Sequence, residues 1–61
     1  MKAKEIKIEL LKGAKFENEK ADWFVVNKDG YHIIVKEGRY FFYKTINSLS
    51  IRIAQLINRG Y

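Results

Sequence analysis

The sequence predicts an α+β fold, with a three- to four-stranded antiparallel sheet arranged as a meander and one C-terminal helix packed on one face. Two runs rich in β-branched and aromatic residues, DWFVV and YHIIV, flank the turn-forming segment NKDG. A second turn-forming segment, KEG, separates YHIIV from RYFFYKT. The C-terminal segment places apolar residues at the spacing of an amphipathic helix. Together these patterns indicate two linked hairpins followed by a helix.

Residues 1–61 are expected to form a single small domain, because a chain of this length has room for only one core. The absence of cysteine excludes disulfides and thiolate metal sites. It also favours the cytoplasm, since secreted domains of this size usually depend on disulfides. No apolar run approaches the length of a membrane span, and the charged N-terminal segment is unlike a signal peptide. We therefore expect no membrane partner.

The first segment, residues 3–12, has two interpretations. Ile6, Ile8 and Leu10 alternate with charged residues, which is the pattern of a half-buried strand. A helix over the same residues would scatter apolar side chains around its axis. The pattern therefore favours a strand, and a helix remains the alternative.

Residues 13–22 combine turn formers with charged residues and predict a loop, with a short strand near Phe16 as the alternative. The two hairpins that follow predict strands at 22–27, 31–36 and 39–45. The segment NKDG suits a three-residue hairpin loop, and two-residue turns remain the alternative. The turn length matters because a slip of one residue exchanges the two faces of a strand.

Residues 46–59 predict the C-terminal helix. Its apolar stripe consists of Leu49, Ile53, Leu56 and Ile57. Asn47 or Ser48 is expected to cap the N-terminus, because either side chain can accept a hydrogen bond from a free backbone N–H. Gly60 is the expected left-handed stop.

A single helix can cover only one face of the sheet, whereas residues 40–43 are all aromatic and direct rings to both faces. In the middle strand, Tyr31, Ile33 and Val35 form the more apolar side, which we expect to meet the helix. The rings on the uncovered side then need another cover. The alternatives are the N-terminal segment or the loop, a protein partner, a second copy of the chain, or stacked nucleic-acid bases.

The candidate partner-binding residues form two groups. With two-residue turns, Phe41 and Tyr43 lie on the uncovered side of the sheet, beside cationic groups. Ile51 lies on the helix almost opposite the apolar stripe, where it could contact another protein. The full set is Arg39, Phe41, Tyr43, His32 and Lys36 on the sheet, and Ile51, Arg52 and Gln55 on the helix.

The sequence offers little catalytic chemistry. His32 is the only histidine, and general acid–base catalysis usually needs a group that orients the imidazole or a nucleophile beside it. No nucleophile-elbow, P-loop or zinc-protease motif is present. We therefore expect a protein that is not an enzyme, with no catalytic residues, no metal and no cofactor.

In size and architecture the chain resembles small phage- and prophage-encoded proteins, among them the anti-CRISPR inhibitors and other host-takeover proteins. The resemblance covers residues 22–60, where hairpins of the WFVVNKDG kind precede YKTINSL and an amphipathic helix. It implies a stoichiometric binder that blocks a host protein or nucleoprotein without catalysis. We therefore expect a small cytoplasmic protein-binding modulator or inhibitor, with a homodimer as a further alternative.

Nucleic acid is the alternative partner. The net charge of +5 is spread along the chain, so it permits an anionic partner without requiring one. A helix at residues 3–12 would give the order αβββα, which is similar to the double-stranded-RNA-binding fold and to the HicA-type mRNA interferase toxins. In that resemblance DGYHIIV would replace the toxin's Gly-Ser-His element, and the serine is missing.

Overall fold

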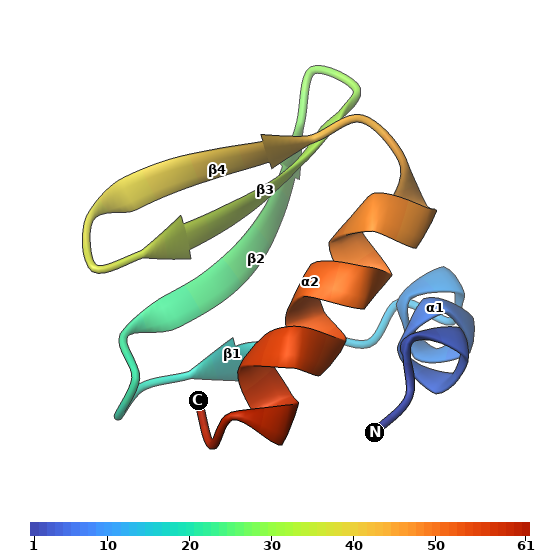
Figure 1. Cartoon of the computed structure of the whole chain (residues 1–61). Helices are drawn as coiled ribbons and strands as arrows, with labels where there is room; N and C mark the ends of the chain where they lie inside the picture. The colour runs from blue at the N-terminus through green and yellow to red at the C-terminus, as the bar shows by residue number, and fades with distance from the viewer.

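The computed structural model describes all residues from 1 to 61 and contains two helices and one four-stranded antiparallel sheet (Figure 1). The elements are α1 (Ala3–Leu11), β1 (Glu17–Asn18), β2 (Trp23–Lys28), β3 (Tyr31–Lys36), β4 (Arg39–Tyr43) and α2 (Ile46–Asn58). The strands lie in sequence order, so β4 is an edge strand with no neighbour on its outer side. The predicted α+β meander with a C-terminal helix is confirmed, and α1 is an additional helix.

Residues 3–11 form a helix, so the strand that the alternating pattern favoured is wrong. The alternation concealed a second spacing, because Ala3, Ile6 and Leu10 share one side of a helix. All three pack into the core, and Ile6 is fully buried. They pack beside α2, which lies between α1 and the sheet (Figure 1). Packing decides the structure of this segment, since so short a helix would be marginal in isolation.

Both hairpins have two-residue turns, at residues 29–30 and 37–38. All the turn residues have positive φ, from 52° at Glu37 to 80° at Gly30, as in type I′ turns. The three-residue hairpin loop that NKDG suggested is therefore wrong, because Asp29 adopts the left-handed conformation. Type I′ turns match the twist of the flanking strands, which explains their preference over wider turns.

The helices cover the face of the sheet that was expected to be uncovered. Trp23 and Ile34 are buried in the core together with the apolar stripe of α2. Tyr31, Ile33 and Val35 alternate with Ile34 and point to the other face, so the expectation that they meet the helix is wrong. That expectation compared the two sides of β3 alone. The covered face depends on the apolar side chains of all the strands. Burying the large indole of Trp23 outweighs the difference between the two sides of β3.

α2 begins slightly earlier than its expected cap. Thr45 is the N-cap, instead of Asn47 or Ser48, and its backbone is extended with φ −124° and ψ 152°. The Ser48 N–H donates a hydrogen bond of 3.1 Å to the Thr45 Oγ1 atom. The capping chemistry is therefore as expected, but the residue that supplies it lies just outside the expected helix.

The apolar stripe and the end of α2 agree with the sequence. The residues that pack in the core are Leu49, Ile53 and Leu56, with Ile57 at its margin. Gly60 has φ 85°, and the Tyr61 N–H donates to the Leu56 carbonyl at 2.9 Å. This Schellman closure satisfies a carbonyl that the helix leaves free, so the predicted stop at Gly60 is confirmed.

Candidate protein-binding surface

The face of the sheet away from the helices carries a continuous set of apolar side chains, which we call the open face. It consists of Phe24, Val26, Tyr31, Ile33, Val35, Tyr40 and Phe42. Cross-strand pairing places these residues side by side, since Phe24 lies opposite Val35 and Val35 lies opposite Tyr40. The same register aligns a second row across the strands, formed by Val26, Ile33 and Phe42. Every strand of the main meander therefore contributes to one surface.

The rings at the edge of the open face are the most exposed part of it. Tyr40 is 67% exposed and Phe42 is 60% exposed, both on the edge strand β4. Phe24 is 42% exposed and Tyr31 is 43% exposed. Complete burial of a side chain of this size contributes roughly 1.5–3 kcal/mol. Each of these rings, which are 42–67% exposed, therefore leaves about half of that free energy unused.

The centre of the open face is already well packed. Ile33 is only 7% exposed although no helix covers it, because Val26 and Phe42 lie on either side. The rings of Tyr31 and Phe42 meet edge to face, with centroids 6.0 Å apart and planes at 79°. Such a contact contributes about 0.5–1.5 kcal/mol beyond the burial of the two rings.

Charge is confined to the margin of the open face. Lys28 lies opposite Tyr31 at the end of β2, and Glu17 lies opposite Phe24 in β1. The rise of about 3.3 Å per residue separates these two positions by roughly 13 Å along the strands. The surface therefore has one cation at one end, one anion at the other, and apolar side chains between them.

A sheet of this kind normally exposes one polar face. Antiparallel sheets with one face on a core alternate between apolar and polar residues, whereas strands buried on both faces are apolar at consecutive positions. The segments FVV, IIV and YFFY of β2, β3 and β4 follow the second pattern. Both helices lie on the same side of the sheet, so nothing in the chain covers the open face (Figure 1).

The sheet residues predicted to bind a partner lie on the helix side instead. His32 pairs with Tyr43 and Lys36 pairs with Arg39, on the same face as the buried Ile34. Tyr43 packs against the core and His32 is half-buried. The expectation that these side chains line the uncovered face is therefore wrong, because Trp23 draws their face toward α2.

Two of these residues still reach solvent at the margin of the helix layer. Phe41 is 41% exposed and Arg39 is exposed, because both belong to the edge strand β4. The Lys36 ammonium lies 3.1 Å from the Glu37 carboxylate and 5.1 Å from the centroid of the Tyr61 ring. Lys36 thus connects the sheet to the C-terminal end of the chain.

The predicted helix residues form a separate surface on α2. Ile51 is 52% exposed and borders a shallow hollow with Lys4 and Lys7 of α1. The Arg52 guanidinium donates a hydrogen bond of 3.1 Å to the Gln55 side-chain oxygen. The structure therefore separates these residues from the open face, and their binding of a partner stays a prediction.

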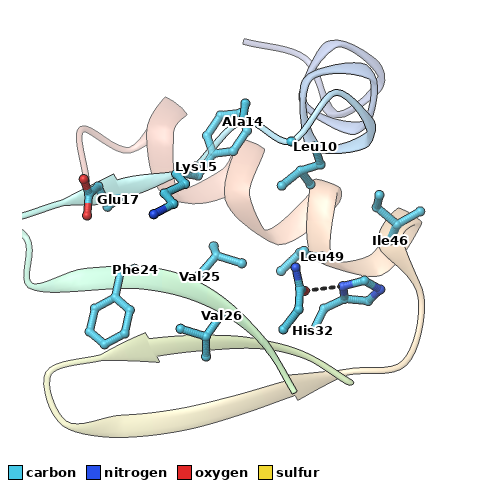
Figure 2. A pocket seen from close by; sticks show the side chains of 13 residues that line it. Leu10, Ala14, Lys15, Glu17, Phe24, Val25, Val26, His32, Ile46 and Leu49 are labelled. Atoms are coloured by element: carbon cyan, nitrogen blue, oxygen red, sulfur yellow. Dashed lines mark hydrogen bonds between the residues drawn. The ribbon is translucent and has the colours of Figure 1, made fainter. Parts of the chain in front are cut away.

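A groove of about 610 Å³ opens at the free edge of β2, between the C-terminal end of α1 and the first turns of α2 (Figure 2). Its walls are mainly apolar and include Leu10, Val25 and Leu49. The polar residues that line it are Lys15, Glu17, Asn27 and His32. The Nδ1 atom of His32 lies 2.7 Å from the Asn27 Oδ1 atom. Asn27 is the only hydrogen-bond partner of the imidazole, so no acid or nucleophile orients it for catalysis.

The structure contains neither a cluster of metal-binding side chains nor a helix that could span a membrane. No group of three His, Cys, Asp or Glu side chains is close enough to hold a metal ion. Neither helix is long and apolar enough to cross a membrane.

Comparison with protein-family models, with curated proteins and with solved structures finds no match. The function is therefore proposed from the geometry and chemistry of these surfaces. Sequence reasoning missed all the residues of the open face, which are Phe24, Val26, Tyr31, Ile33, Val35, Tyr40 and Phe42. The alternation in the long strands showed that side chains point to both faces, but the face that is covered depends on the packing of Trp23 and Ile34 against α2.

Proposed function

We propose that this chain is a small non-catalytic protein that acts in the cytoplasm by binding another protein in a fixed ratio, as a modulator or an inhibitor. The open face is its main binding surface. The observation that carries the proposal is an apolar, aromatic sheet face that neither helix covers. Contiguous exposed apolar patches mark interaction sites in soluble proteins.

The composition of the open face suits a protein partner. Tyrosine and phenylalanine are enriched in protein interfaces, where charged residues are depleted from the centre and gather at the rim. The open face follows this plan, with Tyr40 and Phe42 exposed, Ile33 at the centre, and Lys28 and Glu17 at the margin. Aromatic side chains on strands also lose little conformational entropy when a partner binds.

The test compares two adjacent phenylalanines of β4 that point to opposite faces. Phe42→Ser removes a ring of the open face, and Phe41→Ser removes a partly exposed ring of the helix side. Tagged variants are used to recover partners from the cells that produce the chain, and circular dichroism confirms that each is folded. We expect Phe42→Ser to lose the partner and Phe41→Ser to keep it. Loss only with Phe41→Ser would move the binding surface to the helix side.

Nucleic acid is the second candidate partner. The presence of α1 gives the order αββββα, close to the order αβββα that resembles the double-stranded-RNA-binding fold and the HicA-type toxins. The open face also presents several rings on which bases could stack, although Lys28 is its only cation. Nuclease treatment before recovery separates the candidates, since a protein partner survives it. Toxic expression relieved by His32→Ala would instead favour an mRNA interferase.

A further inference from the structure

We infer that the open face binds a second copy of this chain, so that two sheets pack face to face in a two-fold dimer. The inference rests on the proposed function, because it uses the same binding surface and names the protein that occupies it. Three features support a second copy: the area of the open face, its composition, and the positions of its two charges.

The exposed area of the open face matches a small specific interface. Aromatic side chains bury roughly 150–250 Å² each, so the exposed parts of Phe24, Tyr31, Tyr40 and Phe42 leave roughly 400 Å² of ring surface per copy in water. Two copies would remove roughly 800 Å² of ring surface, and Val26 with the flanking backbone would bring the total to about 1,000 Å². Specific interfaces begin at about this size.

The composition of the open face is that of an interface between identical subunits. Homodimer interfaces are more apolar than interfaces between proteins that also exist apart. The long strands place only one charged side chain on this face, Lys28 at its end. A two-fold contact requires only that one patch be complementary to itself, and a continuous apolar sheet face meets this requirement.

The two marginal charges select one orientation of the second copy. Glu17 and Lys28 lie at opposite ends of the strands. When the two sheets pack with their strands antiparallel, Glu17 of each copy approaches Lys28 of the other. When the strands run parallel, like charges lie at the same end of the sandwich. Such rim charges set orientation more than affinity, so the geometry points to the antiparallel arrangement.

In this dimer the strands are covered on both sides. The layers run helix, sheet, sheet, helix, with the two sheets about 10 Å apart, as in other sheet sandwiches. The consecutive apolar residues of β2, β3 and β4 are then all buried. The outer surfaces remain those of the two helices, including the exposed Ile51.

The mass of the purified chain in solution tests the inference. Sedimentation velocity from nanomolar to submillimolar concentration should show twice the chain mass of 7.2 kDa at the upper end. Phe42→Ser should raise the dissociation constant by more than about tenfold, because a ring is lost from both sides of the contact. Leu11→Ser, which removes an exposed apolar side chain from the end of α1, should leave the dissociation constant unchanged.

A charge exchange tests the orientation without disturbing the core, because both side chains are exposed. Lys28→Glu alone and Glu17→Lys alone should each weaken the dimer several-fold. The double variant should restore the wild-type dissociation constant, since the opposite charges meet again. Failure of the double variant to recover would overturn the antiparallel arrangement even if Phe42→Ser did not fold.

The remaining outcomes separate this inference from the proposed function. A wild-type chain that stays monomeric at submillimolar concentration overturns the inference, as does a dimer that Ile51→Ser disrupts and Phe42→Ser does not. If the monomeric chain still recovers a protein that Phe42→Ser cannot recover, the proposed function stands with a different partner. If Phe42→Ser recovers everything that the wild type recovers, both proposals fail.

Discussion

At the scale of single residues, stability depends on a few fully buried side chains. Leu56 is 2% exposed, and Ile6, Leu49 and Ile53 are each 1% exposed or less. A chain of this length has a small core, so each of these side chains carries a large share of it. Trp23 of β2 belongs to the core, and its burial decides which face of the sheet the helices cover.

Leu56→Ala should lower the free energy of unfolding by ~2–5 kcal/mol, because it removes buried methyl groups and leaves a cavity. A loss of this size approaches the total stability of many small domains, so the variant is expected to be partly or fully unfolded. Chemical denaturation followed by circular dichroism measures it. Ile51→Ala on the same helix is the matched control, and its exposed side chain should contribute little. Equal effects of the two substitutions would contradict the packing of α2.

At the scale of elements, the type I′ turns fix the register of the whole sheet. Asp29 and Glu37 precede glycines and adopt φ of 54° and 52°. Aspartate tolerates this conformation better than glutamate, because its short side chain can bond to the local backbone. The second turn is therefore the less favourable of the two.

Glu37→Asn should raise the free energy of unfolding by up to about 1 kcal/mol, because asparagine adopts the left-handed conformation more readily. The substitution also removes the exposed ion pair with Lys36, which contributes about 0–1 kcal/mol. Glu37→Gln is the control, since it removes the ion pair and keeps the conformational cost. The thermal midpoints of the two variants should therefore differ, with Glu37→Asn higher. Identical midpoints would show that the turn carries no strain.

The elements also show where sequence reasoning succeeds and where it fails. The meander and α2 could be predicted, because their patterns are local: turn residues between β-rich runs, and a stripe at helical spacing. The helix at residues 3–11 could not, since Ile6 and Ile8 fit a strand equally well and only contact with α2 decides. The covered face was missed for a similar reason, because it depends on Trp23 in one strand and Ile34 in the next.

At the scale of the whole molecule, both helices lie on one side of the sheet, and the second face of the sheet has no cover (Figure 1). The candidate site therefore follows from the arrangement of layers and from no single motif. Strand sequence alone indicated that rings point both ways; it did not indicate which rings remain exposed. That answer required the turn lengths and the position of α2 together.

If the chain dimerises through the open face, its thermal midpoint should rise with protein concentration, because mass action favours the folded dimer. Phe42→Ser should show a lower midpoint that does not depend on concentration. Calorimetry over a roughly hundredfold range of protein concentration measures the thermal midpoints of the wild type and of Phe42→Ser. A wild-type midpoint independent of concentration would indicate that the folded chain does not associate over this range.

The unpaired outer edge of β4 is a potential site of aggregation. A flat, apolar edge strand is a template on which further strands can add, and the segment YFFY has the aromatic content, low charge and absence of proline found in fibril-forming peptides. Arg39 and Lys44 flank this segment and act as gatekeepers, because stacking strands in register would bring their like charges together. We therefore expect substitution of these two cations, which take no part in the core, to lower the solubility of the chain.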